Sequence, residues 1–252
     1  MDKRTQIREY FDAPKPKFPV KWLLIGIAAI VIGAVIGQST ITLIFIVAGL
    51  LVGGIPIFSY MKAKKRYEAR PSDSQMDAWL EEGFKEITPI GLKKLGFDTD
   101  EIMGEEIVIS GPVLWQPNGV PREDIRWIVG KDGVARFSIY DVSIFYITEK
   151  GIGIYRSFYN FVKNVTLNDS TDEYFYKNIT RVGTKEKSSN HTLPDGQKLV
   201  SSEVFNLDVA GNSEIEIVLT DPAIEKFTGG TIPTSRAEKA VQTIKKLVRE
   251  KN

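Results

Sequence analysis

The sequence predicts an α+β protein, in which a two-helix transmembrane hairpin precedes a mainly β sandwich or barrel capped by a C-terminal amphipathic helix. Three observations carry this prediction. Two long uncharged segments lie close together near the N-terminus, residues 106–219 alternate apolar and polar side chains between turn residues, and apolar residues after Ser235 recur at helical spacing. The 252 residues are enough for one medium domain and an accessory segment.

Charge is unevenly distributed along the chain. Residues 1–70 contain 11 basic and 4 acidic side chains, a net charge of +7, whereas residues 71–252 contain 22 and 28, a net charge of −6. The positive charge therefore surrounds the hydrophobic segments, where it can meet anionic lipid headgroups, and the remainder has no net attraction for nucleic acid. Cysteine is absent, which excludes disulfides, thiolate metal sites and a cysteine nucleophile.

The N-terminal segment, residues 1–21, is basic, and the hairpin follows it at residues 22–61. A bilayer core about 30 Å thick needs roughly 20 helical residues, so the run 41–61 is long enough and the run 22–37 is slightly short unless Lys21 snorkels. Only Gln38, Ser39 and Thr40 separate the two runs, which predicts antiparallel neighbouring helices. A cleaved signal peptide is the alternative for the first run, but the second span that follows at once argues against it.

Basic residues lie on both sides of the hairpin and are missing from its turn. Because Lys and Arg beside membrane helices stay on the cytoplasmic side, both flanks predict the same orientation. The membrane-orienting residues are Lys15, Lys17, Lys21, Lys62, Lys64, Lys65 and Arg66. We therefore expect an integral membrane protein with two spans, with both termini and the soluble domain cytoplasmic. Asn-x-Ser/Thr sequons at Asn164, Asn168, Asn178 and Asn190 would instead suit a secretory compartment, but they also arise by chance in loops rich in Asn and Thr.

Glycines recur four residues apart in both spans, as Gly33 with Gly37 and Gly49 with Gly53. This spacing puts small residues on one helix face and lets two backbones approach closely. The glycines are predicted to pack the two helices of the hairpin together. The alternative is that they join separate chains into a homo-oligomer.

The soluble part is predicted to begin with a basic and polar linker, residues 62–73, and a short helical region, residues 74–105. Two short helices are expected there, one around residues 77–84 and one that starts with Thr88 as N-cap and Pro89 as the first helical residue. Residues 106–252 form the β-domain with its helix. Its expected strands are 107–114, 125–130, 134–147, 151–159, 173–176, 180–187, 198–208 and 213–219, with turns at 131–133 and 211–212. Residues 235–238 read as a capping box for the last helix.

Two short motifs support a comparison with a known family. The segment 145–152, Phe-Tyr-Ile-Thr-Glu-Lys-Gly-Ile, and the segment 175–182, Phe-Tyr-Lys-Asn-Ile-Thr-Arg-Val, resemble recurring hairpin elements of bacterial pleckstrin-homology-like (PH-like) domains. The order of seven or eight strands and one final helix resembles the same family over residues 106–250. The polar insert 188–197 and the region 73–105 depart from its pattern.

The PH-like resemblance implies a non-catalytic platform that binds proteins or lipid headgroups. Candidate headgroup-binding residues are Arg122, Arg126, Lys131 and Arg136, although charges spaced along strands usually form a solvated face. Candidate partner-binding aromatics are Phe158, Tyr159 and Phe161, whose alternative role is packing inside the domain.

Sequence motifs for catalysis are missing. The single histidine, His191, lies in a Ser/Asn-rich stretch typical of an exposed loop, and neither a phosphate-binding glycine loop nor a metal-ligand spacing is present. We therefore expect no enzyme, cofactor, metal or nucleic acid. The first hypothesis is a membrane-anchored adaptor or scaffold that binds a protein partner. The alternatives are a lipid-headgroup sensor at the inner membrane face and a structural subunit of a larger membrane complex.

Overall fold

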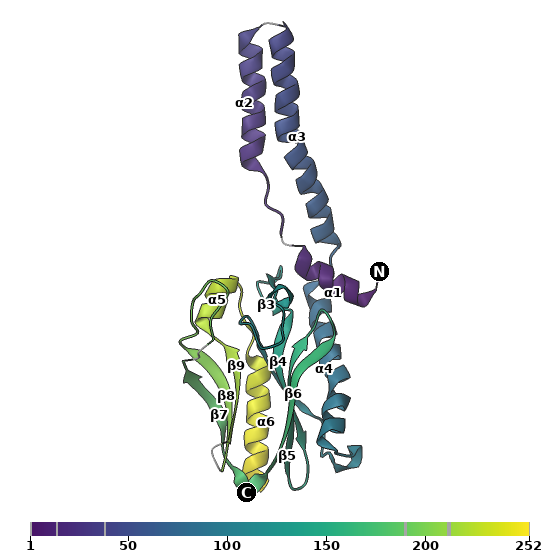
Figure 1. The fold of residues 1–252 in the computed structure, drawn as a ribbon, viewed down its shortest axis with the longest axis vertical. Helices are drawn as coiled ribbons and strands as arrows, with labels where there is room; N and C mark the ends of the chain where they lie inside the picture. The colour runs from purple at the N-terminus through teal and green to yellow at the C-terminus, as the bar shows by residue number, and fades with distance from the viewer. Residues whose placement is uncertain (1, 14, 38, 189–190, 211–212, 252) are drawn as a thin grey trace. The chain divides into compact units, whose positions relative to one another are not determined.

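The computed structural model describes residues 2–13, 15–37, 39–188, 191–210 and 213–251. The chain forms two compact units, Met1–Pro71 and Ser72–Asn252 (Figure 1). The expected turns at Gln38 and at Gly211-Asn212, and the sequon at Asn190, lie outside the described residues.

The first unit contains α1 (Lys3–Asp12), α2 (Val20–Ile36) and α3 (Ser39–Ala69). The apolar helices α2 and α3 pack along each other as a hairpin, and α2 ends at Gly37, which adopts the left-handed conformation with φ of 69°. Residues Thr40–Glu68 form a helix long and apolar enough to cross a membrane, whereas α2, at 17 residues or about 26 Å, is shorter. The structure therefore contains the predicted helical hairpin, with one helix of full spanning length.

The basic N-terminal segment contains a helix that sequence patterns did not predict. In α1, Ile7, Tyr10 and Phe11 are buried. The guanidinium of Arg70 lies 4.6 Å from the ring centroid of Tyr10 and 4.0 Å from that of Tyr67. These cation–π contacts join α1 to the end of the first unit.

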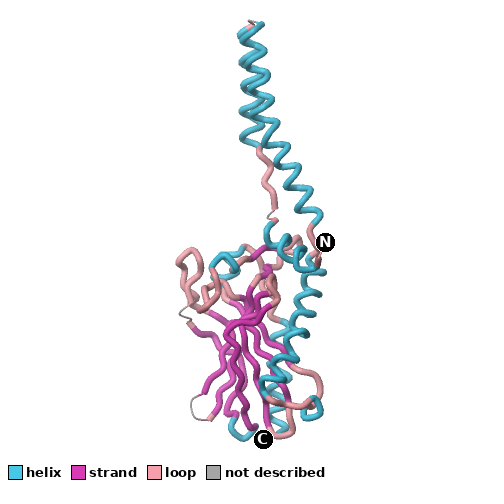
Figure 2. Tube along the Cα trace, turned by 45° about the vertical axis from the view of Figure 1, so that its right-hand side comes forward, coloured by secondary structure: helices cyan, strands magenta, loops and turns pink. Residues whose placement is uncertain are grey.

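The second unit begins with α4 (Asp73–Leu95) and continues as a β-domain of three antiparallel sheets (Figure 2). The four-stranded sheet has the order β1-β4-β5-β6, the three-stranded sheet has the order β7-β8-β9, and β2 and β3 form a small hairpin. The strands are β1 (Ile107–Pro112), β2 (Trp127–Val129), β3 (Ala135–Phe137), β4 (Ile139–Ile147), β5 (Gly151–Asn160), β6 (Val165–Phe175), β7 (Ile179–Lys187), β8 (Ser202–Val209) and β9 (Ser213–Thr220). Two helices follow, α5 (Pro222–Thr228) and α6 (Ser235–Lys251).

Side chains of the four-stranded sheet alternate between two helices. Tyr155 of β5 faces α4, while the neighbouring Ile154 belongs to a core shared with both larger sheets and with α6. From α6, the residues Ala237, Ala240, Val241 and Ile244 enter this core. The amphipathic helix predicted at the C-terminus is thus confirmed, and it lies between the two larger sheets (Figure 1).

The expectation of a barrel is wrong, because the sheets do not close into one. They approach each other where β1 passes β9. At this point Gly111 lies so close to the carbonyl oxygen of Val218 that a Cβ atom would collide with it. The two sheets are otherwise joined through side chains and α6 rather than through a continuous ladder of hydrogen bonds.

Two local predictions also differ from the structure. The two short helices expected around residues 77–95 are one continuous helix, α4, with Pro89 inside it. Thr88, read as an N-cap, donates its hydroxyl to the Phe84 carbonyl, and its own carbonyl accepts the Tyr146 hydroxyl at 2.6 Å. Tertiary contacts of α4 thus outweigh the breaking tendency of proline. The strand expected at 173–176 is the end of the longer β6.

Candidate functional site

A cleft of about 330 Å³ lies in the second unit, where α4, β1, β3 and the segment before α6 meet. Its walls are largely apolar and come from residues far apart in the sequence: Leu80, Phe84, Val108, Pro112, Phe137 and Leu219. Asp77, Asp132 and Arg136 form its polar side. Apolar walls with a few convergent polar groups are typical of ligand-binding clefts, whose volumes start at about 300 Å³.

The polar side of the cleft is organised around the buried side chain of Arg136. Its Nε and Nη2 donate to the two carboxylate oxygens of Asp77, both at 2.7 Å. Its Nη1 and Nη2 donate to the carboxylate of Asp132 at 3.0 and 2.7 Å, and Nη1 also reaches the Val134 carbonyl at 3.3 Å. These contacts use all five N–H donors of the guanidinium. Arg136 therefore fastens α4 to the β2–β3 hairpin and has no donor left for an anion.

The turn between β2 and β3 positions one of these carboxylates. Gly133, with φ of 80°, closes the turn predicted at residues 131–133. At the start of α4, the Asp73 carboxylate accepts the backbone N–H groups of Lys131 at 2.6 Å and Asp132 at 3.3 Å. A Cβ atom on Gly130 would collide with Arg136 Nη1, so glycine is needed for this arrangement.

The electrostatics of the cleft favour cations. Two carboxylates surround one guanidinium and Glu81 also lines the cleft, so its three acidic side chains and one basic side chain have a formal charge of −2. The Asp77 and Asp132 side chains are still 54% and 41% exposed. Arg136 lowers the pKa of Asp132, so this group stays ionised at neutral pH. Burial raises the pKa of the Tyr140 hydroxyl to about 12, and this hydroxyl accepts the backbone N–H of Phe137. A positively charged group can thus be bound at the polar side without displacing Arg136.

The four candidate headgroup-binding residues do not converge on one pocket. Arg136 is held by two aspartates in the cleft, whereas Arg122 lines a second depression that also includes Gln116 and Trp127. Arg126 donates to the Glu123 carbonyl at 2.9 Å, and Lys131 is exposed at the tip of the β2–β3 turn. The arrangement offers no cluster of available cations for a phosphate.

The candidate partner-binding aromatics lie inside the domain. Tyr159 and Phe161 are buried, and the half-buried Phe158 packs against an apolar cluster that includes Leu114, Phe137 of β3 and Ile224 of α5. The Tyr159 hydroxyl donates to Asn164 Oδ1 at 2.6 Å, and its ring lies against Gly83 of α4. The expectation that one of these rings is exposed as an anchor is not met by Tyr159 or Phe161, because α4 covers this face of the sheet.

Three of the four hairpin glycines named from the sequence, Gly33, Gly49 and Gly53, contact the opposite helix, and Gly37 does not. A Cβ on Gly49 would lie 2.6 Å from the Gly26 carbonyl oxygen, and one on Gly33 would lie 2.5 Å from Phe45 Cβ. Gly53 faces Gly26 at a looser 3.8 Å. Gly37 is the C-cap of α2 and takes no part in the contact, so its predicted role in helix packing is wrong. The close contact lies within the chain and uses Gly26, which the four-residue spacing did not reveal.

Several residues of the site escaped sequence reasoning. The sequence pattern places Asp77 in the helix expected around residues 77–84 and Asp132 in the turn expected at 131–133, and neither pattern indicates a role in a cleft. The glycines Gly83 and Gly91 of α4 receive tyrosine rings from the sheet. Glycine inside a helical pattern was the available signal, because it often marks a close approach of another element.

Comparisons with known proteins found no similar protein. No family model, no curated protein and no solved structure matches this chain. Among the described residues, no group of three or more His, Asp or Glu side chains is arranged to hold a metal ion.

Proposed function

We propose that the protein is a non-catalytic, membrane-anchored adaptor that binds a segment of a protein partner in the cleft between α4, β1 and β3. The observation that carries the proposal is the combination of apolar walls with two partly exposed carboxylates beside a fully occupied arginine. Such a cleft suits an apolar side chain that has a lysine or arginine next to it in the partner. Its volume, at the lower end for ligand sites, suits one or two side chains rather than a large cofactor.

The order of strands and the final helix support a PH-like domain, in which α6 fills the space between two sheets. Two features depart from that pattern. The two larger sheets are not joined by a ladder of hydrogen bonds, and the long helix α4 precedes the first strand. A domain of this kind would serve as a binding platform. The basic flanks of the hairpin support its placement on the cytoplasmic side of a membrane, with the hairpin as anchor.

Two alternatives have weaker support. Headgroup binding by the β-domain would need free cations, and the geometry of Arg136 argues against this role. In a structural subunit the glycines would contact other chains, whereas Gly26, Gly33 and Gly49 are engaged within the hairpin. Gly54, which is exposed and meets nothing within 4 Å, is the kind of outward-facing small residue that this alternative would use. If the isolated residues 71–252 bound anionic vesicles better than neutral ones, the first alternative would regain support.

Site-specific photo-crosslinking in the membrane of the native host tests the adaptor proposal. A photoreactive amino acid at Leu80, half-buried in the cleft wall, should give a discrete adduct with one protein. The same group at Ile90, which is 40% exposed on the same helix and lies outside the cleft, is the control. The full chain purified in mild detergent should carry the same partner in fixed stoichiometry.

A second pair of variants tests the charge of the cleft. Because Asp77 also accepts two hydrogen bonds from Arg136, the melting temperature of each variant is measured beside the adduct, and the comparison is made at a temperature where both are folded. Asp77→Lys places a cation where the proposed ligand cation would bind, and it should reduce the Leu80 adduct. Glu82→Lys makes the same charge change at a position of α4 that does not line the cleft, and it should leave the adduct unchanged. Equal adducts from the Leu80 and Ile90 positions, or a purified chain without a partner, would contradict the proposal.

A further inference from the structure

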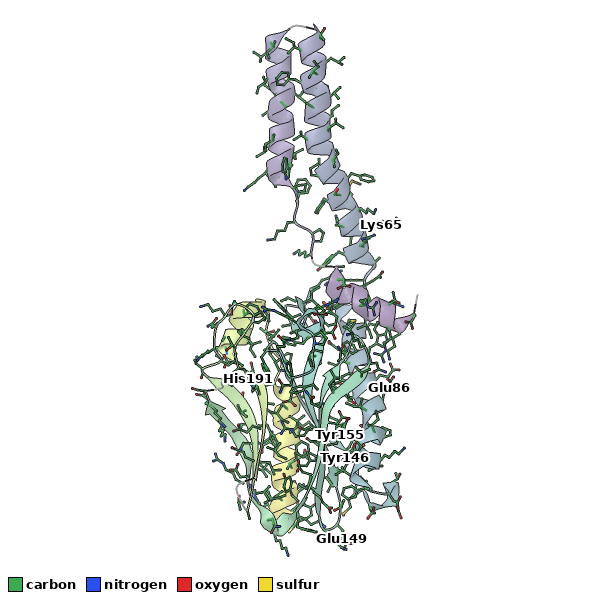
Figure 3. The ribbon with its side chains drawn as sticks, viewed as in Figure 1. Lys65, Glu86, Tyr146, Glu149, Tyr155 and His191 are labelled. Atoms are coloured by element: carbon green, nitrogen blue, oxygen red, sulfur yellow. The ribbon has the colours of Figure 1, made fainter. Side chains whose placement is uncertain are left out.

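The last turns of α3 have an outer face that changes from apolar to cationic within two helical turns. This face begins with Phe58 and continues with Met61, Lys62 and Lys65, which lie three, four and seven residues after it, so all four side chains share one face of the helix. Phe58 and Met61 are 71% and 60% exposed, and both lysines are exposed as well. Lys65 projects from α3 in Figure 3. We call these four residues the α3 face.

The α3 face points away from α2. The opposite side of α3 carries Gly49, which meets the Gly26 backbone, and Tyr60, whose ring centroid lies 5.1 Å from that of Phe18. The contact between Tyr60 and Phe18 joins the basic ends of both hairpin segments. Trp22, which is 54% exposed, lies at this same end of α2. Tyr and Trp concentrate at the level of lipid headgroups, so this end of the hairpin matches the membrane interface.

We propose that the α3 face is a binding site for an anionic phospholipid. An acyl chain would lie along Phe58 and Met61, and the negatively charged headgroup would be bound between Lys62 and Lys65. Charge complementarity selects this occupant, because the two lysines follow directly on apolar side chains at the level where headgroups begin. Lys64 lies on another side of the helix, with its Nζ 3.8 Å from Glu68 Oε1, and is not part of the site.

The inference rests on the proposed membrane anchoring but not on the cleft. It assigns lipid recognition to the first unit and leaves the β-domain for protein recognition. Because Lys62 and Lys65 would each contact the bound headgroup directly, removing one should weaken anionic lipid retention about fivefold at low ionic strength. High salt should have a similar effect through screening.

Lipid retention by the full chain tests the site. The protein is equilibrated in mixed micelles of phosphatidylglycerol and phosphatidylcholine, and the lipids retained after purification are quantified by mass spectrometry. We expect enrichment of phosphatidylglycerol over the bulk ratio, its loss in the double variant Lys62→Gln/Lys65→Gln, and its retention in Lys17→Gln/Lys64→Gln. The second variant removes the same charge from the same end of the hairpin.

Two results would overturn the inference. One is phosphatidylglycerol retained only at its bulk ratio by the unmodified protein. The other is an equal loss of phosphatidylglycerol enrichment in both double variants, which would indicate diffuse charge attraction. Flotation of the full chain with neutral phosphatidylcholine vesicles separates this failure from a failure of anchoring. A chain that floats but shows no phosphatidylglycerol enrichment overturns the lipid site alone. A chain that does not float overturns the membrane anchor and the lipid site together.

Discussion

The two units use glycine in opposite ways. In the hairpin, Gly26 and Gly49 bring one helix backbone against another, and apolar side chains such as Val35 and Phe58 remain exposed. In the second unit, Gly83 and Gly91 of α4 receive the large side chains of Tyr159, Tyr146 and Tyr155. Tyr146 and Tyr155 come from the neighbouring strands β4 and β5 (Figure 3).

The proposed membrane location of the hairpin would account for this difference through the solvent that each unit meets. Between helices in lipid there is little hydrophobic gain, so close backbone packing provides the attraction. In water, burial of aromatic rings is the larger contribution, and a glycine that admits a ring adds to it. The same residue type therefore marks a helix–helix contact in one unit and a helix–sheet contact in the other.

The largest expected effect follows from filling the contact of α4 with the sheet. Gly91→Leu would place side-chain atoms where the Tyr146 hydroxyl and the Tyr155 ring lie, so α4 should be displaced. We expect a loss of about 3 kcal/mol and a fall in melting temperature on the order of 10 °C. Tryptophan fluorescence of the full chain in detergent measures it, because Trp79, Trp115 and Trp127 all lie in the second unit.

Ile90→Leu is the matched control, since Ile90 is an exposed neighbour on the same helix. It should change the melting temperature by only a degree or two, in keeping with the small effects of surface substitutions. A Gly91→Leu variant as stable as Ile90→Leu would show that α4 does not depend on close contact with these tyrosines.

The next effect concerns the hairpin. Gly49→Leu should separate α2 from α3, because a Cβ there already lies 2.6 Å from the Gly26 carbonyl oxygen. Gly54→Leu, five residues further along α3, meets nothing within 4 Å and is the control. Since the chain has no cysteine, the pair Phe18→Cys/Tyr60→Cys can report proximity by crosslinking. The yield of the crosslink between the two cysteines should fall several-fold with Gly49→Leu and be unchanged with Gly54→Leu. Equal crosslink yields in the two variants would contradict the backbone contact at Gly49.

The sequence was sufficient for the parts of the fold that follow from periodicity. Alternation and turn residues located most strands within two or three residues, because each strand has one face in a core, and the spacing of Ala237, Ala240, Val241 and Ile244 located α6. The first eight residues of β6, which precede Glu173, were missed because most of their side chains are exposed and show no alternation. Helix α4 was divided at Pro89, because its continuity depends on contacts with β4 and β5.

The candidate site was far less accessible from sequence. Arg136 was identified as a charged residue near a loop, but its role depends on Asp77, which lies 59 positions earlier in the chain. Composition cannot show that all five donors of one guanidinium are occupied. For the aromatic candidates the sequence left two roles open, an exposed anchor and packing inside the domain. Tyr159 and Phe161 are buried, which supports packing, and the contact of Tyr159 with Gly83 of α4 could not be foreseen from the aromatic pattern of β5.

The next effect is a dependence of the stability of the second unit on pH. Burial raises the pKa of Asp141 in β4 to about 6, although Arg156 lies 3.7 Å away and opposes the shift. Above its ordinary pKa of 3.8 the unfolded chain releases this proton, while the folded chain keeps it until about pH 6. The free energy of unfolding should therefore decrease between pH 4 and 6, by at most about 3 kcal/mol.

Asp141→Asn should remove this decrease and stabilise the second unit at pH 7, because amide and protonated carboxyl groups are both neutral. Urea unfolding followed by tryptophan fluorescence at pH 4, 5, 6 and 7 measures the difference between the two proteins. The variant's advantage should grow through this range and then level off. Parallel curves would mean that Asp141 is ionised in the folded protein throughout, with Arg156 outweighing its burial.

The smallest effect is expected at the contact of Tyr60 with Phe18, a single ring contact between α3 and the segment before α2 rather than a contact of two packed backbones. Tyr60→Leu keeps an apolar side chain but removes an edge-to-face ring contact of about 0.5–1.5 kcal/mol. Protease accessibility of the segment around Lys17 should rise slightly, while the melting temperature of the second unit stays constant. If that melting temperature fell as well, the two units would be energetically coupled. The stability of the second unit would then depend in part on the packing of the hairpin, and the two modes of packing could not be treated as independent.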